Sequence, residues 1–221
     1  MLAVLQYLDF FGIYVQRVAM STVANCCRHL TQATAKRALE VVPIVGQVLG
    51  YSDTRLVESA CRCVCLMTQK MAKDEQALEQ LMSHLLPAVC ALLERGLGNE
   101  TNSLPTLPND LYTDVLDALS QAARISTSLA HSLVEHHLVS TLFVLLTGAP
   151  DPTVVVPRSA LLQNFAMHSP VQIQAAVSLL QDVLPPLPQD GIFDARAYSE
   201  KAYMQKWRRA ERRSEEHTSE L

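Results

Sequence analysis

The chain has 221 residues and a formal net charge of −4, so it can hold one elongated domain or two small ones and predicts no nucleic-acid partner. It is 49% apolar but only 5% aromatic, and its Leu, Ala and Val content favours helices packed on helices over a β-sandwich. The longest apolar run, Leu85 to Leu93, is too short to span a bilayer, and the N-terminus lacks a secretory signal. We therefore expect no membrane partner and an intracellular location, in the cytoplasm, the nucleus or both.

The first predicted element is a pair of apolar helices between Leu5 and Leu30 that meet at Gly12. The second helix of this pair carries small side chains on its inner face: Ala19, Val23, Ala24 and Cys27. Small residues let one helix lie close against the next, as a stacked helical repeat requires.

Three later segments align with one another and indicate an internal repeat. They are VVPIVGQVLG (Val41 to Gly50), LLPAVCALLERG (Leu85 to Gly96) and LVSTLFVLLTG (Leu138 to Gly148). The first two blocks are offset by 41 to 44 residues, a spacing typical of armadillo and HEAT repeats. The matched prolines, Pro43 and Pro87, either begin a third helix in each unit or kink a longer one.

Polar and turn-forming residues mark the ends of the expected helices. Asp53 and Asp74 are candidate N-caps. The stretch 96–109 is rich in Gly, Pro and Asn and predicts an exposed loop, after which a helical pattern resumes at Asp110. A second proline-rich breaker covers 148–157, and Ser169 followed by Pro170 predicts another helix start.

The pattern predicts an all-α fold, an armadillo/HEAT-like α-solenoid of about three to four repeats with a disordered or irregular C-terminal tail. Residues 1–148 hold three units, with the loop at 96–109. Residues 149–196 form a partial further repeat and a closing segment, and residues 197–221 form the tail.

The six cysteines form no C-x-x-C pair. On a helix, Cys61 and Cys65 share one face while Cys63 points nearly opposite, whereas a zinc site needs four converging ligands. The spacing therefore favours small core residues in a reducing compartment. We expect no metal and no cofactor.

The remaining candidate groups favour structural roles. His136 and His137 are adjacent and diverge by about 100° on a helix, so they indicate a helix–helix corner better than a shared metal site. Asp9 has no His or second carboxylate at a useful offset, which favours a cap or salt bridge over a general base. The sequence contains neither a Gly-rich phosphate loop nor G-x-S-x-G, and it indicates no catalytic residue.

The tail is basic, with Lys201, Lys206, Arg208, Arg209, Arg212 and Arg213. A nucleic-acid or nuclear-import role is one interpretation. A solvated charged segment is favoured, because only Tyr203 and Trp207 could offer a stacking platform.

The chain contains, in order, YLDFF (Tyr7 to Phe11), VQR (Val15 to Arg17), ANCC (Ala24 to Cys27), SDTRLVESACRC (Ser52 to Cys63) and LLQDVLPPLPQDGIFDAR (Leu179 to Arg196). In this order and spacing these segments resemble the armadillo-repeat region of HECT-type E3 ubiquitin ligases. The class is that of the ubiquitin-fusion-degradation, thyroid-receptor-interacting and KAKTUS ligases. The resemblance covers residues 1 to about 196.

The resemblance implies a fragment that binds protein substrates or degradation signals for a catalytic HECT domain, whose cysteine accepts ubiquitin as a thioester. Nothing here matches that domain, so the full-length ligase would be the enzyme. Because Met1 falls inside a family repeat, we expect a truncated array that can self-associate through its cut repeat ends. The last nine residues, Arg213 to Leu221, resemble translated sequencing-adaptor sequence and are set aside.

Third-helix surfaces usually line the concave side of armadillo folds. On that basis the candidate protein-binding residues are Gln47, His84, Glu94 and Ser140. The alternative function is a non-catalytic armadillo or HEAT adaptor or scaffold protein.

Overall fold

The computed structural model describes residues 1–96, 107–149 and 155–184. Within these ranges every regular element is a helix, which confirms the prediction of an all-α fold. The elements are α1 (Leu2–Leu5), η1 (Leu8–Phe10), α2 (Ile13–Arg28), α3 (Gln32–Ala38), η2 (Leu39–Val41), α4 (Val42–Val48), α5 (Thr54–Met71), α6 (Glu75–Gly96), α7 (Asn109–Ile125), α8 (Thr127–Glu135), α9 (Leu138–Thr147), α10 (Arg158–Met167) and α11 (Pro170–Val183). Most of the predicted loop at 96–109, part of the breaker, the closing segment and the basic tail lie outside the described residues.

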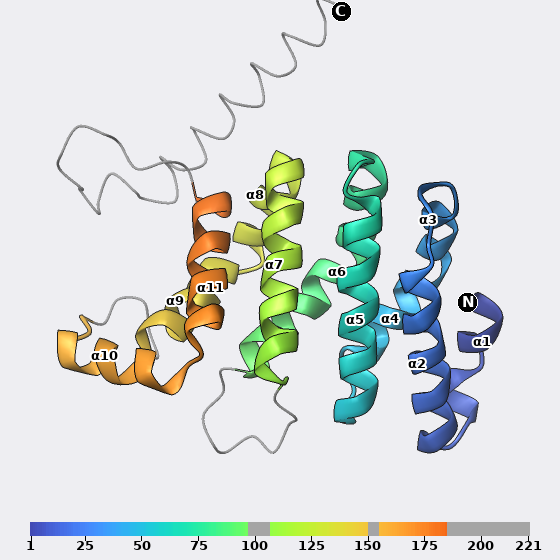
Figure 1. The fold of residues 1–221 in the computed structure, drawn as a ribbon, viewed down its shortest axis with the longest axis horizontal. Helices are drawn as coiled ribbons and strands as arrows, with labels where there is room; N and C mark the ends of the chain where they lie inside the picture. The colour runs from blue at the N-terminus through green and yellow to red at the C-terminus, as the bar shows by residue number, and fades with distance from the viewer. Residues whose placement is uncertain (97–106, 150–154, 185–221) are drawn as a thin grey trace, which may run out of the picture. The chain divides into compact units, whose positions relative to one another are not determined.

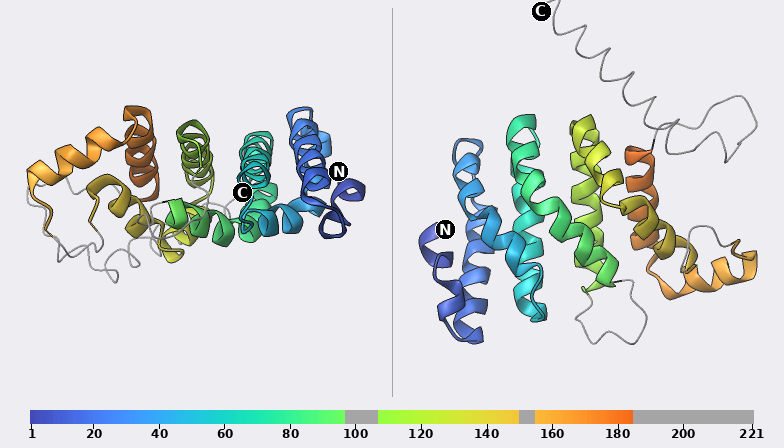
Figure 2. Two further views of the ribbon diagram at one scale, coloured as in Figure 1. Left: turned by 90° about the horizontal axis from the view of Figure 1, so that it is seen from below. Right: turned by 180° about the vertical axis from the view of Figure 1, so that it is seen from behind.

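Four long helices form one layer of the fold. Helices α2, α5, α7 and α11 lie side by side in that order, each in contact with the next (Figure 1). A second layer lies behind them, where α4 contacts α6 and α6 contacts both α8 and α9 (Figure 2). Each of the first three long helices is followed by its return helices: α3 and α4 after α2, α6 after α5, and α8 and α9 after α7. Residues 1–183 therefore form the predicted armadillo-like stack.

Some hydrogen bonds join residues of consecutive units, and their donor and acceptor residues lie about one repeat length apart in the sequence. The Arg95 guanidinium donates to the backbone carbonyl of Leu49, 46 residues earlier in the chain. The Ser126 hydroxyl donates to the Glu79 carboxylate over 2.6 Å, across 47 residues. These separations are typical of armadillo-type repeats.

Helix α5 is buried on two sides, because it lies between α2 and α7. Four positions at helical spacing make up one of its faces, and each is 0% exposed: Leu56, Ala60, Cys63 and Met67. Cys63 lies beside Cys27 of α2, with which it shares a hydrogen bond. Cys61, predicted to point away from Cys63, is equally buried, because the other side of α5 is covered too.

The predicted helix starts are confirmed at Asp53, Asp74 and Pro170. The Asp53 carboxylate accepts a hydrogen bond from the Leu56 amide (3.0 Å), and the Asp74 carboxylate accepts one from the Ala77 amide (3.1 Å). Pro170 is the first residue of α11. These contacts satisfy amide groups that have no partner inside the helix.

The two matched prolines have different places. Pro43 lies in the first turn of α4, where its missing N–H leaves no hydrogen bond unmade. Pro87 lies inside α6, which continues as one helix to Gly96. Proline therefore begins a helix in one unit and is contained in a longer helix in the next.

The predicted corner at the two histidines is also confirmed. Helix α8 ends at Glu135 and α9 begins at Leu138. His137 adopts a left-handed backbone with φ of 60°, which turns the chain between the two helices.

Candidate protein-binding surface

The layer of long helices carries a groove between α2 and α5. It encloses about 430 Å³ and is lined by Tyr14, Arg17, Val18, Ser21, Thr22, Arg55, Glu58, Ser59 and Arg62. Arg17 is held by the N-cap residue of α5: its Nε lies 3.1 and 3.2 Å from the two carboxylate oxygens of Asp53. This bidentate pair holds the pKa of Asp53 below its usual value, chiefly through the hydrogen bonds from Arg17.

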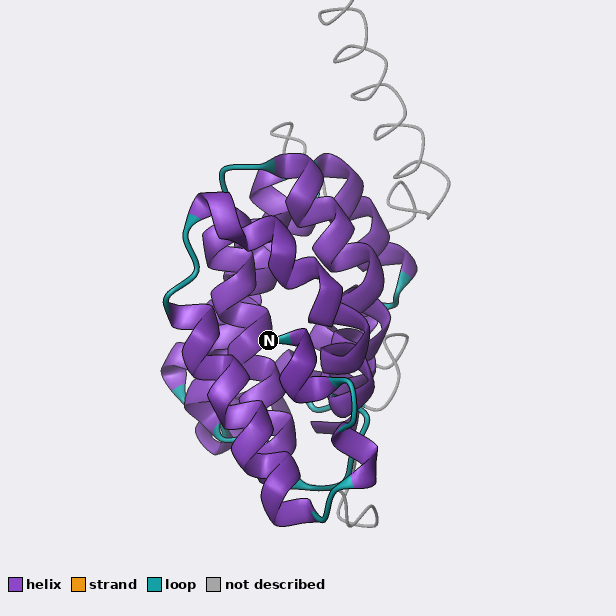
Figure 3. Cartoon of the chain, turned by 90° about the vertical axis from the view of Figure 1, so that its right-hand side faces the viewer, coloured by secondary structure: helices purple, strands orange, loops and turns teal. Residues whose placement is uncertain are grey.

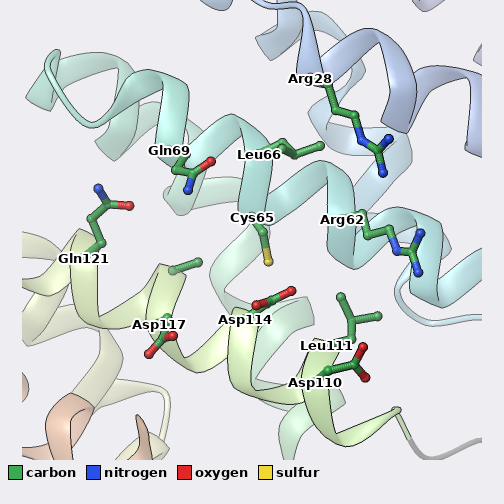
Figure 4. Close-up of a pocket in the computed structure, with 11 residues that line it drawn as sticks. Arg28, Arg62, Cys65, Leu66, Gln69, Asp110, Leu111, Asp114, Asp117 and Gln121 are labelled. Carbon is green, nitrogen blue, oxygen red and sulfur yellow. The ribbon is translucent and has the colours of Figure 1, made fainter.

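A second groove lies between α5 and α7 and encloses about 450 Å³. Figure 4 shows its two walls: α5 contributes Arg62, Cys65, Leu66 and Gln69, and α7 contributes Asp110, Asp114 and Asp117. Arg28, at the end of α2, also lines it. Because Arg62 lines both grooves, the two adjoin across α5.

The wall formed by α7 is acidic. Asp110, Asp114 and Asp117 are spaced by four and three residues, so they project from one face of the helix. Partial burial raises the pKa of Asp114 above its usual value, and the neighbouring Asp110 and Asp117 raise it further, while Arg62 opposes them. An approaching cation would relieve this repulsion.

Toward α2, the wall formed by α5 carries Arg55, Glu58 and Arg62, so its net charge is positive. The side chains of Arg55 and Arg62 form no ion pair with any other residue that the structure describes. The groove between α2 and α5 therefore has a net positive lining and the groove between α5 and α7 a net negative one, with Arg62 lying between the two. This arrangement suits a polypeptide that carries both charges.

The four residues predicted from the sequence all lie in the second layer. Gln47 is on α4, His84 and Glu94 are on α6, and Ser140 is on α9, each with an exposed side chain. Gln47 donates to the Tyr51 hydroxyl (3.3 Å), and Glu94 accepts from Thr141 (3.5 Å). None of the four lines either groove, and their role in protein binding stays a prediction.

The aspartate row could have been found in the sequence, because its spacing already places three carboxylates on one helical face. The sequence could not indicate that this row lines a groove, since that depends on how α7 packs against α5. Asp9, for which the sequence favoured a cap or salt bridge, accepts a hydrogen bond from the Tyr51 hydroxyl (2.6 Å), which raises the pKa of Tyr51 to about 12.

The cysteines mostly fill the core, as the spacing predicted. Four of the six are buried, and all six are free. Burial raises the pKa of Cys65 and of Cys90 to about 12. In the part of the chain that the structure covers, no three His, Cys, Asp or Glu side chains are grouped to hold a metal ion.

No single helix among the described residues is long and apolar enough to cross a membrane. Helices α8 and α9 reach that length and apolarity only as a pair, and they are bent by 69° at their junction.

Comparison with curated proteins identifies relatives of this chain. It is 31% identical over 189 residues to the E3 ubiquitin-protein ligase UPL3 of Arabidopsis thaliana, and 29% identical over 207 residues to the E3 ubiquitin-protein ligase TRIP12 of Danio rerio. The chain is homologous to one segment of the HECT-type E3 ubiquitin ligases. A probable ubiquitin fusion degradation protein of Schizosaccharomyces pombe is 27% identical over 190 residues.

The match to UPL3 covers 86% of this chain, the match to TRIP12 covers 91%, and the match to the S. pombe protein covers 86%. The chain spans only about a tenth of each relative's length: 10% of UPL3, 9% of TRIP12 and 11% of the S. pombe protein. No family model matches the chain. The resemblance seen in the sequence is confirmed for this one segment of the ligases.

A solved structure shares the fold of this chain. An engineered protein overlays on 82% of this chain and 78% of its own, with a TM-score of 0.51 and 15% identity. A designed armadillo repeat protein overlays on 80% of this chain and 69% of its own, with a TM-score of 0.49 and 14% identity.

Proposed function

We propose that this segment recognises protein substrates or degradation signals for a HECT-type E3 ubiquitin ligase. Its relatives support the link to the ubiquitin pathway. The observation that carries the recognition role is the pair of adjoining, oppositely charged grooves along α2, α5 and α7. Solenoids use such extended surfaces to bind other proteins.

The charges suggest how a bound polypeptide would lie. An extended segment crossing α5 would place acidic side chains near Arg55 and Arg62, and Lys or Arg side chains near Asp114 and Asp117. Exposed ion pairs contribute about 0.2–1 kcal/mol each. Several such ion pairs together would select peptides by the order of their acidic and basic residues more than they would raise the affinity.

Catalysis would belong to the HECT domain of the full-length ligase. A thiol becomes nucleophilic as its thiolate. Burial raises the pKa of Cys61, Cys65 and Cys90, and the hydrogen bond with Cys27, together with burial, raises that of Cys63. The same hydrogen bond lowers the pKa of Cys27, but that thiol is fully buried. Incubated with E1, E2 and ubiquitin, this chain should therefore form no ubiquitin thioester by non-reducing gel analysis. A thioester adduct would contradict the assignment.

The binding role is tested with two labelled probes, an octapeptide of alternating lysine and glycine and one of alternating glutamate and glycine. The double variant Asp114→Asn/Asp117→Asn should weaken binding of the lysine peptide about two- to thirtyfold by fluorescence anisotropy at low salt. It should leave the glutamate peptide unchanged. Because the pKa of Asp114 is raised in the fold, asparagine there removes repulsion and should not cost stability.

The matched control is Glu94→Gln, which removes a carboxylate from the layer behind the grooves. It should leave binding of both peptides unchanged. Equal losses in the control and the double variant would contradict a site between α5 and α7, and would favour the predicted surface around Glu94.

We also propose that the protein is intracellular, in the cytoplasm, the nucleus or both. Six cysteines that are all free support a reducing compartment. Fractionation of cells that express a tagged chain tests this, and recovery from the secreted fraction would contradict it.

A further inference from the structure

Helix α5 separates two grooves of opposite net charge. The groove toward α2 carries the exposed side chains of Arg55 and Arg62, with Glu58 between them in the sequence. The groove toward α7 carries the exposed carboxylates of Asp114 and Asp117. None of these five side chains forms an ion pair with another residue that the structure describes. Both signs of charge are therefore free to meet one ligand that crosses α5.

Arg62 and Asp114 show where such a ligand would cross. Arg62 lines both grooves, and its charge acts on the Asp114 carboxylate across the groove between α5 and α7. Figure 4 shows the two side chains on the facing helices of this groove. A ligand that meets both charges runs along the stack, which is the horizontal direction of Figure 1 and the direction of view in Figure 3.

The distance between the two grooves follows from how the long helices pack. Helices in contact have axes about 8–10 Å apart. Because α2 contacts α5 and α5 contacts α7, the middle of one groove lies about 8–10 Å from the middle of the next. A ligand must therefore present its acidic and basic side chains on one face, at about this separation.

Backbone conformations differ in how well they provide this separation. In a β-strand, side chains on one face are two residues and about 6.7 Å apart, or four residues and about 13 Å apart. In a polyproline II helix, side chains three residues apart share one face and lie about 9.3 Å apart. An α-helix needs seven residues to cover about 10.5 Å. The polyproline II helix matches the distance between the grooves.

Two glutamines favour a ligand whose backbone groups are free. Gln69 of α5 and Gln121 of α7 line the groove between these helices, and their side chains form no hydrogen bond with any residue that the structure describes. A side-chain amide can both donate to a carbonyl and accept from an N–H group. A polyproline II segment has no internal hydrogen bonds, so its backbone can use both. An α-helical ligand would offer them no backbone partner along its length.

We propose that the adjoining grooves bind a short polyproline II segment in which an acidic and a basic residue are three positions apart. The acidic side chain lies beside Arg62 between α2 and α5, and the basic one lies beside Asp114 between α5 and α7. This inference rests on the proposed function and adds to it the conformation and the charge spacing of the ligand. Proline suits the two positions in between, because its ring fixes the backbone near this conformation.

The test uses three peptides in which an aspartate and a 2,4-diaminobutyrate are separated by one, two or three prolines. These charged side chains are short, so they cannot compensate for a change of one residue in spacing. NMR titration of the isotope-labelled full chain at about 0.1 M salt measures the dissociation constants, because distant charges are then largely screened. The two-proline peptide should bind about two- to fivefold more tightly than the others, in which only one charge faces its groove.

Arg62→Gln and Asp114→Asn should each remove the preference for two prolines. The matched control is Arg37→Gln, which removes an exposed arginine of α3 that lines neither groove. This control should keep the preference, and thermal melts check that all three variants fold. Loss of the preference in the control as well would overturn the proposal, because the preference would not come from the grooves.

A fourth peptide tests the conformation. It has a single valine between the two charged residues, and valine favours a strand, so it should bind no more tightly than the one-proline peptide. Tighter binding of the valine peptide than of the two-proline peptide would overturn the proposal, as would no binding of the two-proline peptide at millimolar concentration. Equal binding of all three proline peptides would overturn it too. The proposed function would still stand if the lysine octapeptide depended on Asp114 and Asp117.

Discussion

Helices α2 and α5 occupy equivalent places in consecutive units, yet their equivalent side chains differ in burial. Leu56 of α5 is 0% exposed, whereas Val15, its counterpart one repeat earlier, is 46% exposed. The difference does not come from residue type, since both are aliphatic. It arises because α5 has a long helix on each side and α2 has one on a single side. Position in the stack, more than local sequence, sets how much a side chain contributes to stability.

The largest effect should come from truncating the buried member of this pair. Leu56→Ala removes a fully buried side chain and leaves a cavity, and should lower the free energy of unfolding by about 2–5 kcal/mol. Val15→Ala should change it by less than about 0.5 kcal/mol. Urea unfolding at one fixed, low protein concentration makes the comparison. Similar losses in both variants would mean that the outer face of α2 is covered in the monomer.

The polar version of the comparison uses Cys63 of α5 and Thr22 of α2, which are also 41 residues apart. Cys63→Ser puts a hydroxyl in the fully buried contact with α2 and should lower the free energy of unfolding by about 1–3 kcal/mol. Thr22→Ser, at the equivalent exposed position of α2, should be nearly neutral. A difference in melting temperature shows the effect, and a neutral Cys63→Ser would mean that the α2–α5 contact admits water.

A smaller effect is expected where α2 and α5 are joined by charge. Asp53→Ala removes an N-cap and the partner of Arg17, and should lower the free energy of unfolding by about 1 kcal/mol. The pKa of Asp53 is lower in the folded state than in the unfolded chain. Its stabilisation is therefore complete above the unfolded pKa of about 3.9 and is lost as the pH falls through the lower, folded value.

Asp53→Asn is the control for the charge, because the amide oxygen can still cap the helix while the ion pair with Arg17 is lost. Its free energy of unfolding should change less than wild type's between pH 5 and pH 3 (a span that includes the unfolded aspartate pKa of about 3.9). Equal acid sensitivity in Asp53→Asn and in wild type would show that other carboxylates dominate.

Much of the fold could be predicted because its signals are local. The caps at Asp53 and Asp74 and the corner at His136 and His137 depend on residues only a few positions apart. The repeat spacing and the buried cysteines follow from periodicity. The sequence around Pro87 is compatible both with the start of a helix and with a proline inside a longer helix. Only the structure shows that Pro87 lies inside α6.

The candidate site was harder to predict for the same reason. Gln47, His84, Glu94 and Ser140 were chosen on the expectation that their helices line a groove. None of the four lines the grooves along α2, α5 and α7, and their role in protein binding stays a prediction. The carboxylates of Asp110, Asp114 and Asp117 share a face by spacing alone, but only the packing of α7 against α5 sets Arg62 opposite them.

The sequence alone determined that this protein is a helical repeat array and which ligase segment it resembles. Helix periodicity, caps and motif order all depend on residues that are close together in the sequence. The tertiary structure decided which helix faces are covered and which side chains meet across the grooves. Those properties depend on contacts between helices about 40 to 50 residues apart, and no local pattern specifies them.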